Sequence, residues 1–350
     1  MAGLDKLPRS LDAWRVPDKL QDEDAHWNQL SETGLRALGY CLWTKADWGW
    51  LQQSTDGATV SPNGYLFVTP MRGKEGPVGT IDALREVLLF NGLSRAARSP
   101  EGFDVMLRVM AIGDDGREQL RIWRGLATAP SVLLADNHTL PLLREIDIRR
   151  FTLGVFPLVS QNLEQVYSSW AQSSVGDILD MVLQALEGLA YIHSQGVAHR
   201  DAFKNNFLVQ FFPESLKDGV VSISKPRVYL IDFEVAVHFT DDCPASERVC
   251  TGIPCTGSLS NVSEYARPGI PEMLTGEPYD PFKLDVWQLA SSFGEFDSTF
   301  EPVETLLDSM ASDDPAGRLT ADEAMGRLRA FVESVPPKAL LIPPVIHKFK

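Results

Sequence analysis

The sequence contains no long hydrophobic run and few cysteines. No stretch of its 350 residues approaches the roughly 18–20 consecutive apolar residues of a membrane-spanning helix, and residues 1–26 lack the apolar centre of a signal peptide. Among the four cysteines, Cys243, Cys250 and Cys255 lie close together, but their spacing matches no common zinc site. We therefore expect an intracellular, cytoplasmic protein with reduced thiols and no membrane contact.

Positive charge is also scarce. The chain has 32 Lys and Arg residues against 47 Asp and Glu, a formal net charge of −15, which disfavours binding to nucleic acid or to an anionic membrane. Internal repeats and low-complexity tracts are absent as well. What remains is an ordinary globular composition, 44% hydrophobic and 23% charged. The length suits one large domain or two joined lobes with a substantial core.

Strand-like and helix-like segments are distributed unevenly along the chain. Runs of β-branched and aromatic residues predict strands at 64–69, 103–112, 151–159 and 227–233. Apolar residues at helical spacing predict helices at 117–127, 174–196, 279–293 and 319–334. Ser174 and Asp177 resemble a capping box, and Gly196 is suited to end that helix. Because strands prevail in the first half and helices in the second, we expect an α+β protein with two unlike lobes.

The first 60 residues are polar but rich in tryptophan. They contain five of the eight tryptophans in the chain, namely Trp14, Trp27, Trp43, Trp48 and Trp50. A disordered tail is usually poor in such large aromatic side chains. We therefore predict an N-terminal extension (1–60) that packs on the rest of the molecule. The alternative is an aromatic surface through which this extension contacts a partner.

A motif in the second half of the chain carries the strongest functional signal. Residues 199–206 read HRDAFKNN, so Asn206 follows Asp201 by five positions. The strand-like segment after it ends in Ile-Asp-Phe, which contains Asp232. Three further segments follow in order: IPEML (270–274), KLDVWQLA (283–290) and DPAGRLTADEAM (314–325).

From about residue 85 to residue 334, these motifs and their order resemble the eukaryotic protein-kinase superfamily. The segments GYCLW, NHTLPLL, HRDAF and YDPFKLDVWQLA are also similar to kinase-like proteins of mushroom-forming fungi. The resemblance implies a bilobal protein-kinase-like fold, with a small strand-rich N-lobe (61–159), a larger helical C-lobe (160–335) and a C-terminal tail (336–350). It also implies ATP and Mg²⁺ as cofactors and a protein hydroxyl as the acceptor.

The resemblance assigns the chemistry to three residues. Asp201 would accept the proton of the attacking hydroxyl, and base catalysis of this kind typically contributes about 10²–10⁴-fold in rate. Asn206 and Asp232 would supply ligands to Mg²⁺ at the ATP phosphates, because Mg²⁺ prefers hard oxygen donors.

Five more positions match supporting roles in the family. His199 would pack beneath the site, and Arg200 would pair with a phosphorylated residue of the following loop. Glu272 and Arg318 would form a buried ion pair. Asp285 would brace the loop that carries the catalytic aspartate.

The nucleotide-binding side departs from the family pattern. No G-x-G-x-x-G segment precedes the early strands, and Arg108 stands where the family has an ATP-contacting lysine. Arginine keeps the charge but presents a planar fork instead of a compact ammonium group. Its expected partner on the next helix is either Glu118, one residue away from the best spacing, or the neutral Gln119, which would form a weaker bond.

The loop after Asp201 departs as well. Phe203 stands where Ser/Thr kinases have a lysine that contacts the transferred phosphate, and Lys204 follows one position later. Lys204 is therefore either aimed elsewhere or reaches the same place on its flexible side chain. Glu234 replaces the glycine of the Asp-Phe-Gly pattern. For its side chain we favour a solvent-exposed position over an additional metal ligand.

Three functional hypotheses follow. The leading one is an ATP- and Mg²⁺-dependent protein kinase of the Ser/Thr type, because Asp201, Asn206 and Asp232 are all present. The second is a pseudokinase that binds or scaffolds partners, because the phosphate-contacting segments are altered. The third is a small-molecule phosphotransferase, which segments 270–274 and 283–290 disfavour because they match a peptide-substrate lobe.

Overall fold

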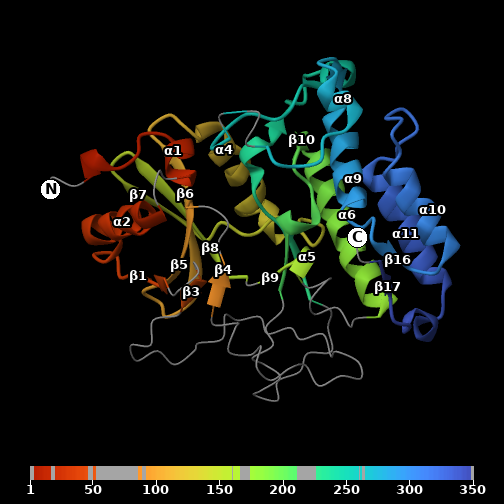
Figure 1. Cartoon of the computed structure of the whole chain (residues 1–350), viewed down its shortest axis with the longest axis horizontal. Helices are drawn as coiled ribbons and strands as arrows, with labels where there is room; N and C mark the ends of the chain where they lie inside the picture. Colours follow the sequence, from red (N-terminus) through yellow and green to blue (C-terminus); the bar gives the residue numbers. More distant parts are fainter. Residues whose placement is uncertain are drawn as a thin grey trace.

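The computed structural model describes residues 4–16, 20–45, 50–52, 86–88, 92–159, 161–165, 174–210, 226–259, 261 and 265–347. Figure 1 shows two unlike halves, with one strand-rich half that includes the N-terminus and one half made mainly of helices. The α+β, bilobal fold predicted from the sequence is confirmed. Among the helices in these ranges, none combines the length and the apolar character that a bilayer crossing requires.

The strand-rich half is built on a five-stranded antiparallel sheet. Its strands, in spatial order, are β1 (Cys41–Leu42), β5 (Ser94–Arg98), β6 (Asp104–Ile112), β8 (Phe151–Pro157) and β7 (Arg144–Ile148). The strands predicted at 103–112 and 151–159 are thus confirmed. On β6, Leu107 and Val109 enter the core on one face of the sheet. Because side chains alternate along a strand, Arg108 points to the opposite face.

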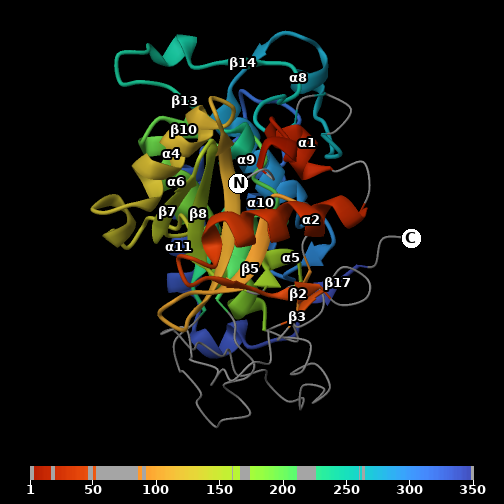
Figure 2. The ribbon, with the colours of Figure 1, turned by 90° about the vertical axis from the view of Figure 1, so that its left-hand side faces the viewer.

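The segment before β1 packs on the sheet face that Leu107 lines. It contains α1 (Leu11–Arg15), α2 (Leu20–Leu30) and the π turn η2 (Ser31–Leu35), and Figure 2 shows α2 lying across the strands. Trp14 and Trp27 are fully buried, and both donate their indole N–H to the carbonyl oxygen of Gly92, at 3.0 and 2.8 Å. Trp43 is buried as well, so these three tryptophans pack as predicted.

Some predictions for the N-terminal region fall on residues outside the described ranges. These are the packing of Trp48, the side chain of Trp50, the strand at 64–69 and the domain boundary at residue 60. They stay predictions. A small three-stranded sheet borders this region, with strands β2 (Thr44–Lys45), β3 (Trp50–Gln52) and β4 (Glu86–Leu88).

Helix α4 (Arg117–Ala127) packs against both halves of the molecule. Its bounds are those predicted from the sequence. Its buried side chains Leu120, Trp123 and Leu126 join the large core of the molecule. The Trp123 ring lies 4.8 Å from that of Phe156 on β8 and 4.9 Å from that of Phe233 in the helical half. The same tryptophan therefore contacts both halves next to Asp232.

The helical half is organised around α6 (Val175–Ser194), which confirms the helix predicted at 174–196. The capping box forms as expected: the Ser174 hydroxyl accepts from Asp177 N, and the Asp177 carboxylate accepts from Ser174 N. Gly196, with φ +70°, follows the end of the helix. The other helices in the described part of this half are α5 (Leu163–Gln165), α8 (Pro271–Leu274), α9 (Pro281–Ser291), α10 (Glu301–Met310) and α11 (Ala321–Ser334).

Short strand pairs frame the loops of the helical half. β10 (Val197–Ala198) pairs with β13 (Val237–His238), and β11 (Phe207–Val209) lies between β12 (Val228–Leu230) and β9 (Gln161–Asn162). Residues 199–206 thus run between two strands, and Asp232 follows a third. Two further pairs are β14 (Cys250–Thr251) with β15 (Pro278–Tyr279), and β16 (Phe296–Asp297) with β17 (Val345–Ile346) in the C-terminal segment.

Candidate active site

The loop of residues 199–206 is held by helix α9. The fully buried carboxylate of Asp285 accepts the backbone N–H groups of His199 (2.7 Å) and Arg200 (2.6 Å). One turn along the helix, the amide of Gln288 accepts from Ala202 N (2.8 Å) and donates to Arg200 O (2.9 Å). Arg200 has φ +67°, a conformation that costs energy for a non-glycine residue and is stabilised here by these contacts. The bracing role predicted for Asp285 matches this geometry.

Asp201 and Asn206 are in direct contact within this loop. The Asn206 side-chain nitrogen donates to the backbone oxygen of Asp201 (2.8 Å) and to its carboxylate (2.7 Å). Because the amide nitrogen is used in this way, the amide oxygen Oδ1 is the donor atom that Asn206 can offer to a cation. Burial raises the pKa of Asp201, although nearby Arg267 opposes the shift.

Asp232 lies beside this pair. Ile231 N donates to the backbone oxygen of Asn206 (2.9 Å), and His199 Nε2 contacts Ile231 O (2.8 Å). Because His199 Nδ1 accepts from Asp201 N (3.3 Å), Nε2 carries the ring hydrogen. Asp232 has φ +66°, and its charge is close enough to raise the pKa of Asp201. The structure therefore brings Asp201, Asn206 and Asp232 together.

Arg108 reaches this group from the strand-rich half. Its Nη2 atom lies 2.6 Å from Asp232 Oδ1 and 3.3 Å from Glu234 Oε2. The alternative pair of Arg108 with Glu118 does not form, although both residues are described. Glu118 instead pairs with Arg121 three residues along α4 (2.6 Å), and its side chain is 60% exposed. The expectation for Glu118 is corrected because α4 turns this position to solvent.

Glu234 is placed differently from the sequence-based expectation of a solvent-exposed side chain. The side chain is only 12% exposed and contacts Arg108, Arg15 and Ser258. Burial and the neighbouring Asp232 carboxylate raise the pKa of Glu234. Glu234 and Asp232 therefore both contact the Arg108 guanidinium. The partners of Glu234 come from segments that are far apart in the chain.

Lys204 pairs with an acidic residue of a later segment. Its ammonium group forms an ion pair with Glu295 and lies 6.0 Å from the centre of the Phe293 ring. Arg267 contacts the Asp201 carboxylate instead, with its Nε and Nη2 atoms at 3.1 and 3.2 Å from the two oxygens. The same guanidinium stacks over the Phe203 ring at 5.3 Å. A cation is thus present beside Asp201, but it comes from a later segment of the chain.

The other residues predicted to support the site are buried or partly buried within the helical half. Arg318 is 1% exposed and binds both oxygens of Glu272, at 2.7 and 3.3 Å. The His199 ring packs against that of Phe233 at 5.0 Å. The Nε atom of Arg200 is buried without a hydrogen-bond partner among the described residues, and its pairing with a phosphorylated residue stays a prediction.

Sequence reasoning missed three participants in the site: Arg15, Gln288 and Arg267. Gln288 lies one turn after Asp285 within the recognised segment 283–290, and this spacing was a usable signal. Arg15 and Arg267 stand in segments without a recognisable motif. Only the packing of distant parts of the chain brings them to Glu234 and Asp201.

The donor set fits Mg²⁺ held jointly by protein and nucleotide. In the described ranges, no three His, Cys, Asp or Glu side chains are arranged to hold a metal by themselves. Mg²⁺ is commonly bound by one or two side-chain oxygens together with substrate phosphates. The amide oxygen of Asn206 and the carboxylate of Asp232 are donors of this kind. Arg108 already contacts the Asp232 carboxylate, so a bound Mg²⁺ would share this carboxylate with Arg108.

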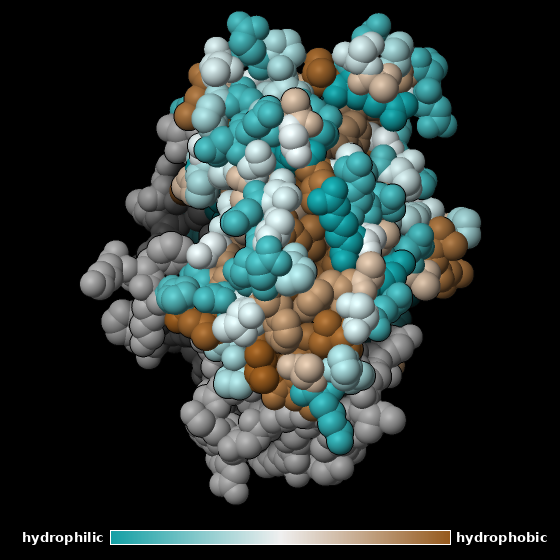
Figure 3. Space-filling view, turned by 90° about the vertical axis from the view of Figure 1, so that its right-hand side faces the viewer, coloured by the Kyte–Doolittle hydropathy of each residue, from teal (hydrophilic) through white to brown (hydrophobic). Residues whose placement is uncertain are grey.

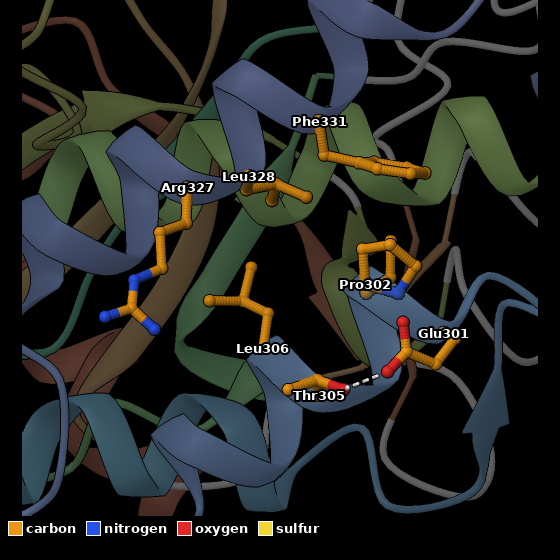
Figure 4. Close-up of a pocket in the computed structure, with 8 residues that line it drawn as sticks. Glu301, Pro302, Thr305, Leu306, Arg327, Leu328 and Phe331 are labelled. Atoms are coloured by element: carbon orange, nitrogen blue, oxygen red, sulfur yellow. Dashed lines mark hydrogen bonds between the residues drawn. The ribbon is translucent and has the colours of Figure 1, made fainter.

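A separate hollow lies between α10 and α11. Its volume is about 290 Å³, and its walls include Leu306, Leu328 and Phe331, with Glu301 and Arg327 at the sides (Figure 4). Figure 3, which views the molecule from the helical side, shows apolar side chains exposed among hydrophilic ones. One carboxylate and one guanidinium among apolar walls do not form a recognisable catalytic group.

The proteins to which the chain is similar are Ser/Thr protein kinases. No protein-family model matches the chain. It is 34% identical over 110 residues to serine/threonine-protein kinase ppk8 of Schizosaccharomyces pombe. This aligned region covers 31% of this chain and 17% of that protein. It is 27% identical over 190 residues to serine/threonine-protein kinase PAK mbt of Drosophila melanogaster, covering 46% and 25%.

A probable inactive serine/threonine-protein kinase of Dictyostelium discoideum is 24% identical over 182 residues, covering 52% of this chain and 12% of that protein. The matched regions span a quarter or less of these relatives. The narrower resemblance to proteins of mushroom-forming fungi stays a prediction. In both sequence similarity and bilobal architecture, the chain is protein-kinase-like.

Proposed function

We propose that the chain is an ATP- and Mg²⁺-dependent protein kinase of the Ser/Thr type, which transfers the γ-phosphoryl group to a protein hydroxyl. The observation that carries the proposal is the contact of Asn206 with Asp201 on a loop braced by Asp285, with Asp232 alongside. These are the base and the oxygen donors that phosphoryl transfer requires.

The residues would share the reaction as follows. Asp201 accepts the proton of the substrate hydroxyl while the hydroxyl oxygen forms a bond to the γ-phosphorus. The bond from that phosphorus to the bridging oxygen breaks, and its electron pair leaves with ADP. Mg²⁺ held by Asn206 and Asp232 would neutralise charge on the phosphates. Arg267 holds both carboxylate oxygens of Asp201 and so fixes the orientation of the base.

A pseudokinase is the second candidate, and one observation favours it. Arg108 engages Asp232 and Glu234 together, and α4 turns Glu118 to solvent, so the nucleotide side lacks the expected Arg108–Glu118 pair. One of the similar proteins is also named as probably inactive. A small-molecule phosphotransferase is less favoured, because Glu272 and Arg318 form the buried pair expected beneath a peptide-binding segment.

The test compares the wild-type chain with Asp232→Ala by thermal unfolding with and without millimolar Mg·ATP, alongside phosphate transfer to a general protein substrate. We expect Mg·ATP to raise the wild-type melting temperature and not that of Asp232→Ala, because binding to the native state alone stabilises it. A wild-type melting temperature unmoved by Mg·ATP would refute nucleotide binding. A shift without any transfer would favour the pseudokinase. The cytoplasmic location stays a sequence-based prediction.

A further inference from the structure

The N-terminal helix α1 contacts the acidic residue beside Asp232. Arg15, the last residue of α1, forms an ion pair with Glu234 and donates to the Ser258 hydroxyl at 2.9 Å. The Ser258 hydroxyl in turn donates to the other carboxylate oxygen of Glu234, at 2.6 Å. Arg15 and Glu234 are 219 positions apart in the sequence. Three distant segments therefore meet in a closed set of contacts.

Hydrogen bonds at both ends of α1 hold the backbone that carries Arg15. Leu11 N donates to the Asp115 carboxylate at 2.7 Å, at the start of α1. At its end, Gly92 N donates to Arg15 O at 3.1 Å, and the Trp14 indole donates to Gly92 O at 3.0 Å. A Cβ atom on Gly92 would lie 2.8 Å from the Trp14 backbone oxygen, so this close approach requires glycine. The segments just before β5 and just after β6 thus anchor the two ends of α1.

The charges in this group depend on one another. Arg108 is shared between Asp232 and Glu234, at 2.6 and 3.3 Å. Glu234 is 12% exposed, and Arg15 is its second cationic partner. If Arg15 were absent, Arg108 would be the remaining cationic partner of the buried Glu234 carboxylate among the described residues. Ser258 would supply a neutral hydrogen bond. Glu234 would then compete with Asp232 for the guanidinium.

We propose that α1 is an intramolecular clamp and that Arg15 is a positioning residue. By neutralising Glu234 and holding Ser258, Arg15 keeps Arg108 on Asp232 and sets the position of that carboxylate. The N-terminal segment then acts within its own chain, on the region where the two halves meet. Only the consequence for nucleotide binding rests on the proposed function, since the clamp itself can be measured without a ligand.

The first experiment uses the full chain without nucleotide. Arg15→Met should lower the melting temperature by about 5 °C, because it leaves a buried carboxylate short of one partner. Amide hydrogen exchange in residues 230–236 and 254–259 should become about tenfold faster. The matched control is Arg9→Met, which removes an exposed arginine from the same segment. Equal melting temperatures and exchange rates in the two variants would overturn the clamp.

A second variant separates the charge effect from a general loss of packing. The double variant Arg15→Met with Glu234→Gln should regain at least half of the decrease in melting temperature caused by Arg15→Met, because the Glu234 charge that lost its partner is no longer present. Failure of the double variant to recover any of the loss would show that Arg15 acts only through packing, and this would overturn its positioning role.

The last measurement links the clamp to Asp232. In Arg15→Met, the rise in melting temperature caused by millimolar Mg·ATP should fall to less than half of the wild-type rise. An unchanged rise would overturn the link to Asp232. If the wild-type chain shows no rise at all, the proposed function fails, and the exchange rates without ligand still decide whether the clamp exists.

Discussion

The catalytic-loop side and the nucleotide side of the candidate site hold their charged groups in different ways. Asp201 sits on a loop whose backbone is bound by Asp285 and Gln288, two side chains one turn apart on a single buried helix. The charges of Arg108 and Glu234 are instead balanced by ion pairs that cross between the two halves of the molecule, and Ser258 adds a hydrogen bond to Glu234. The kinase-like arrangement is therefore retained where one helix supports it and altered where separate segments meet.

The first way to test this comparison is to remove the proposed base, Asp201, on the braced side. Asp201→Asn should lower phosphate transfer by about 10²–10⁴-fold, because the amide cannot accept the proton. The Mg·ATP-induced rise in melting temperature should persist, since Asn206 and Asp232 are unchanged. Transfer assays and thermal unfolding measure the two effects. Transfer at the wild-type rate would show that Asp201 is not the base.

The second test removes the buried ion pair that supports the same side. Arg318→Met should lower the free energy of unfolding by about 3–5 kcal/mol, because Glu272 is left as an unpaired buried charge. Urea unfolding measures the change. The double variant Arg318→Met with Glu272→Gln should regain much of the loss. A loss below about 1 kcal/mol would place this pair among weak surface contacts.

The third test acts on the nucleotide side. Arg108→Met should lower the free energy of unfolding by about 1–3 kcal/mol, because Asp232 and Glu234 lose the cation between them. The effect should be smaller than for Arg318→Met, since Arg15 still neutralises Glu234. Arg108→Lys should recover part of the loss by keeping the charge. Urea unfolding of Arg108→Met, Arg108→Lys and Arg318→Met measures these losses. A larger loss of unfolding free energy for Arg108→Met than for Arg318→Met would contradict the comparison.

The fourth and smallest effect is a pH dependence of stability to which one buried carboxylate on each side contributes. Burial raises the pKa of both Asp201 and Glu234, so the folded state binds their protons more tightly than the unfolded state. Stability should therefore fall as the pH rises from the ordinary carboxyl range through the raised pKa of each group. Asp201→Asn and Glu234→Gln should each remove part of this decline in melting temperature measured against pH. An unchanged pH profile in both variants would contradict the buried placement.

Local sequence patterns predicted the parts of the site that depend on neighbouring residues. The capping box of Ser174 and Asp177 and the strand at 103–112 were predictable because each is determined by spacing within a short segment. The contact of Asn206 with Asp201 spans only five positions. The partners of Arg108, Lys204 and Glu234 were not predictable in this way, because a charged side chain has several acceptable partners and local spacing does not choose among them.

By itself, the sequence determined the α+β elements, the HRD loop and its likeness to protein kinases, since backbone hydrogen bonding and apolar periodicity act over short distances. The tertiary structure alone decided which charges meet. Arg267 reaches Asp201 across 66 positions, Arg108 reaches Asp232 across 124, and Arg15 reaches Glu234 across 219. Such pairs form because packing removes charged groups from water together, and each buried carboxylate then requires the cation that the fold places beside it.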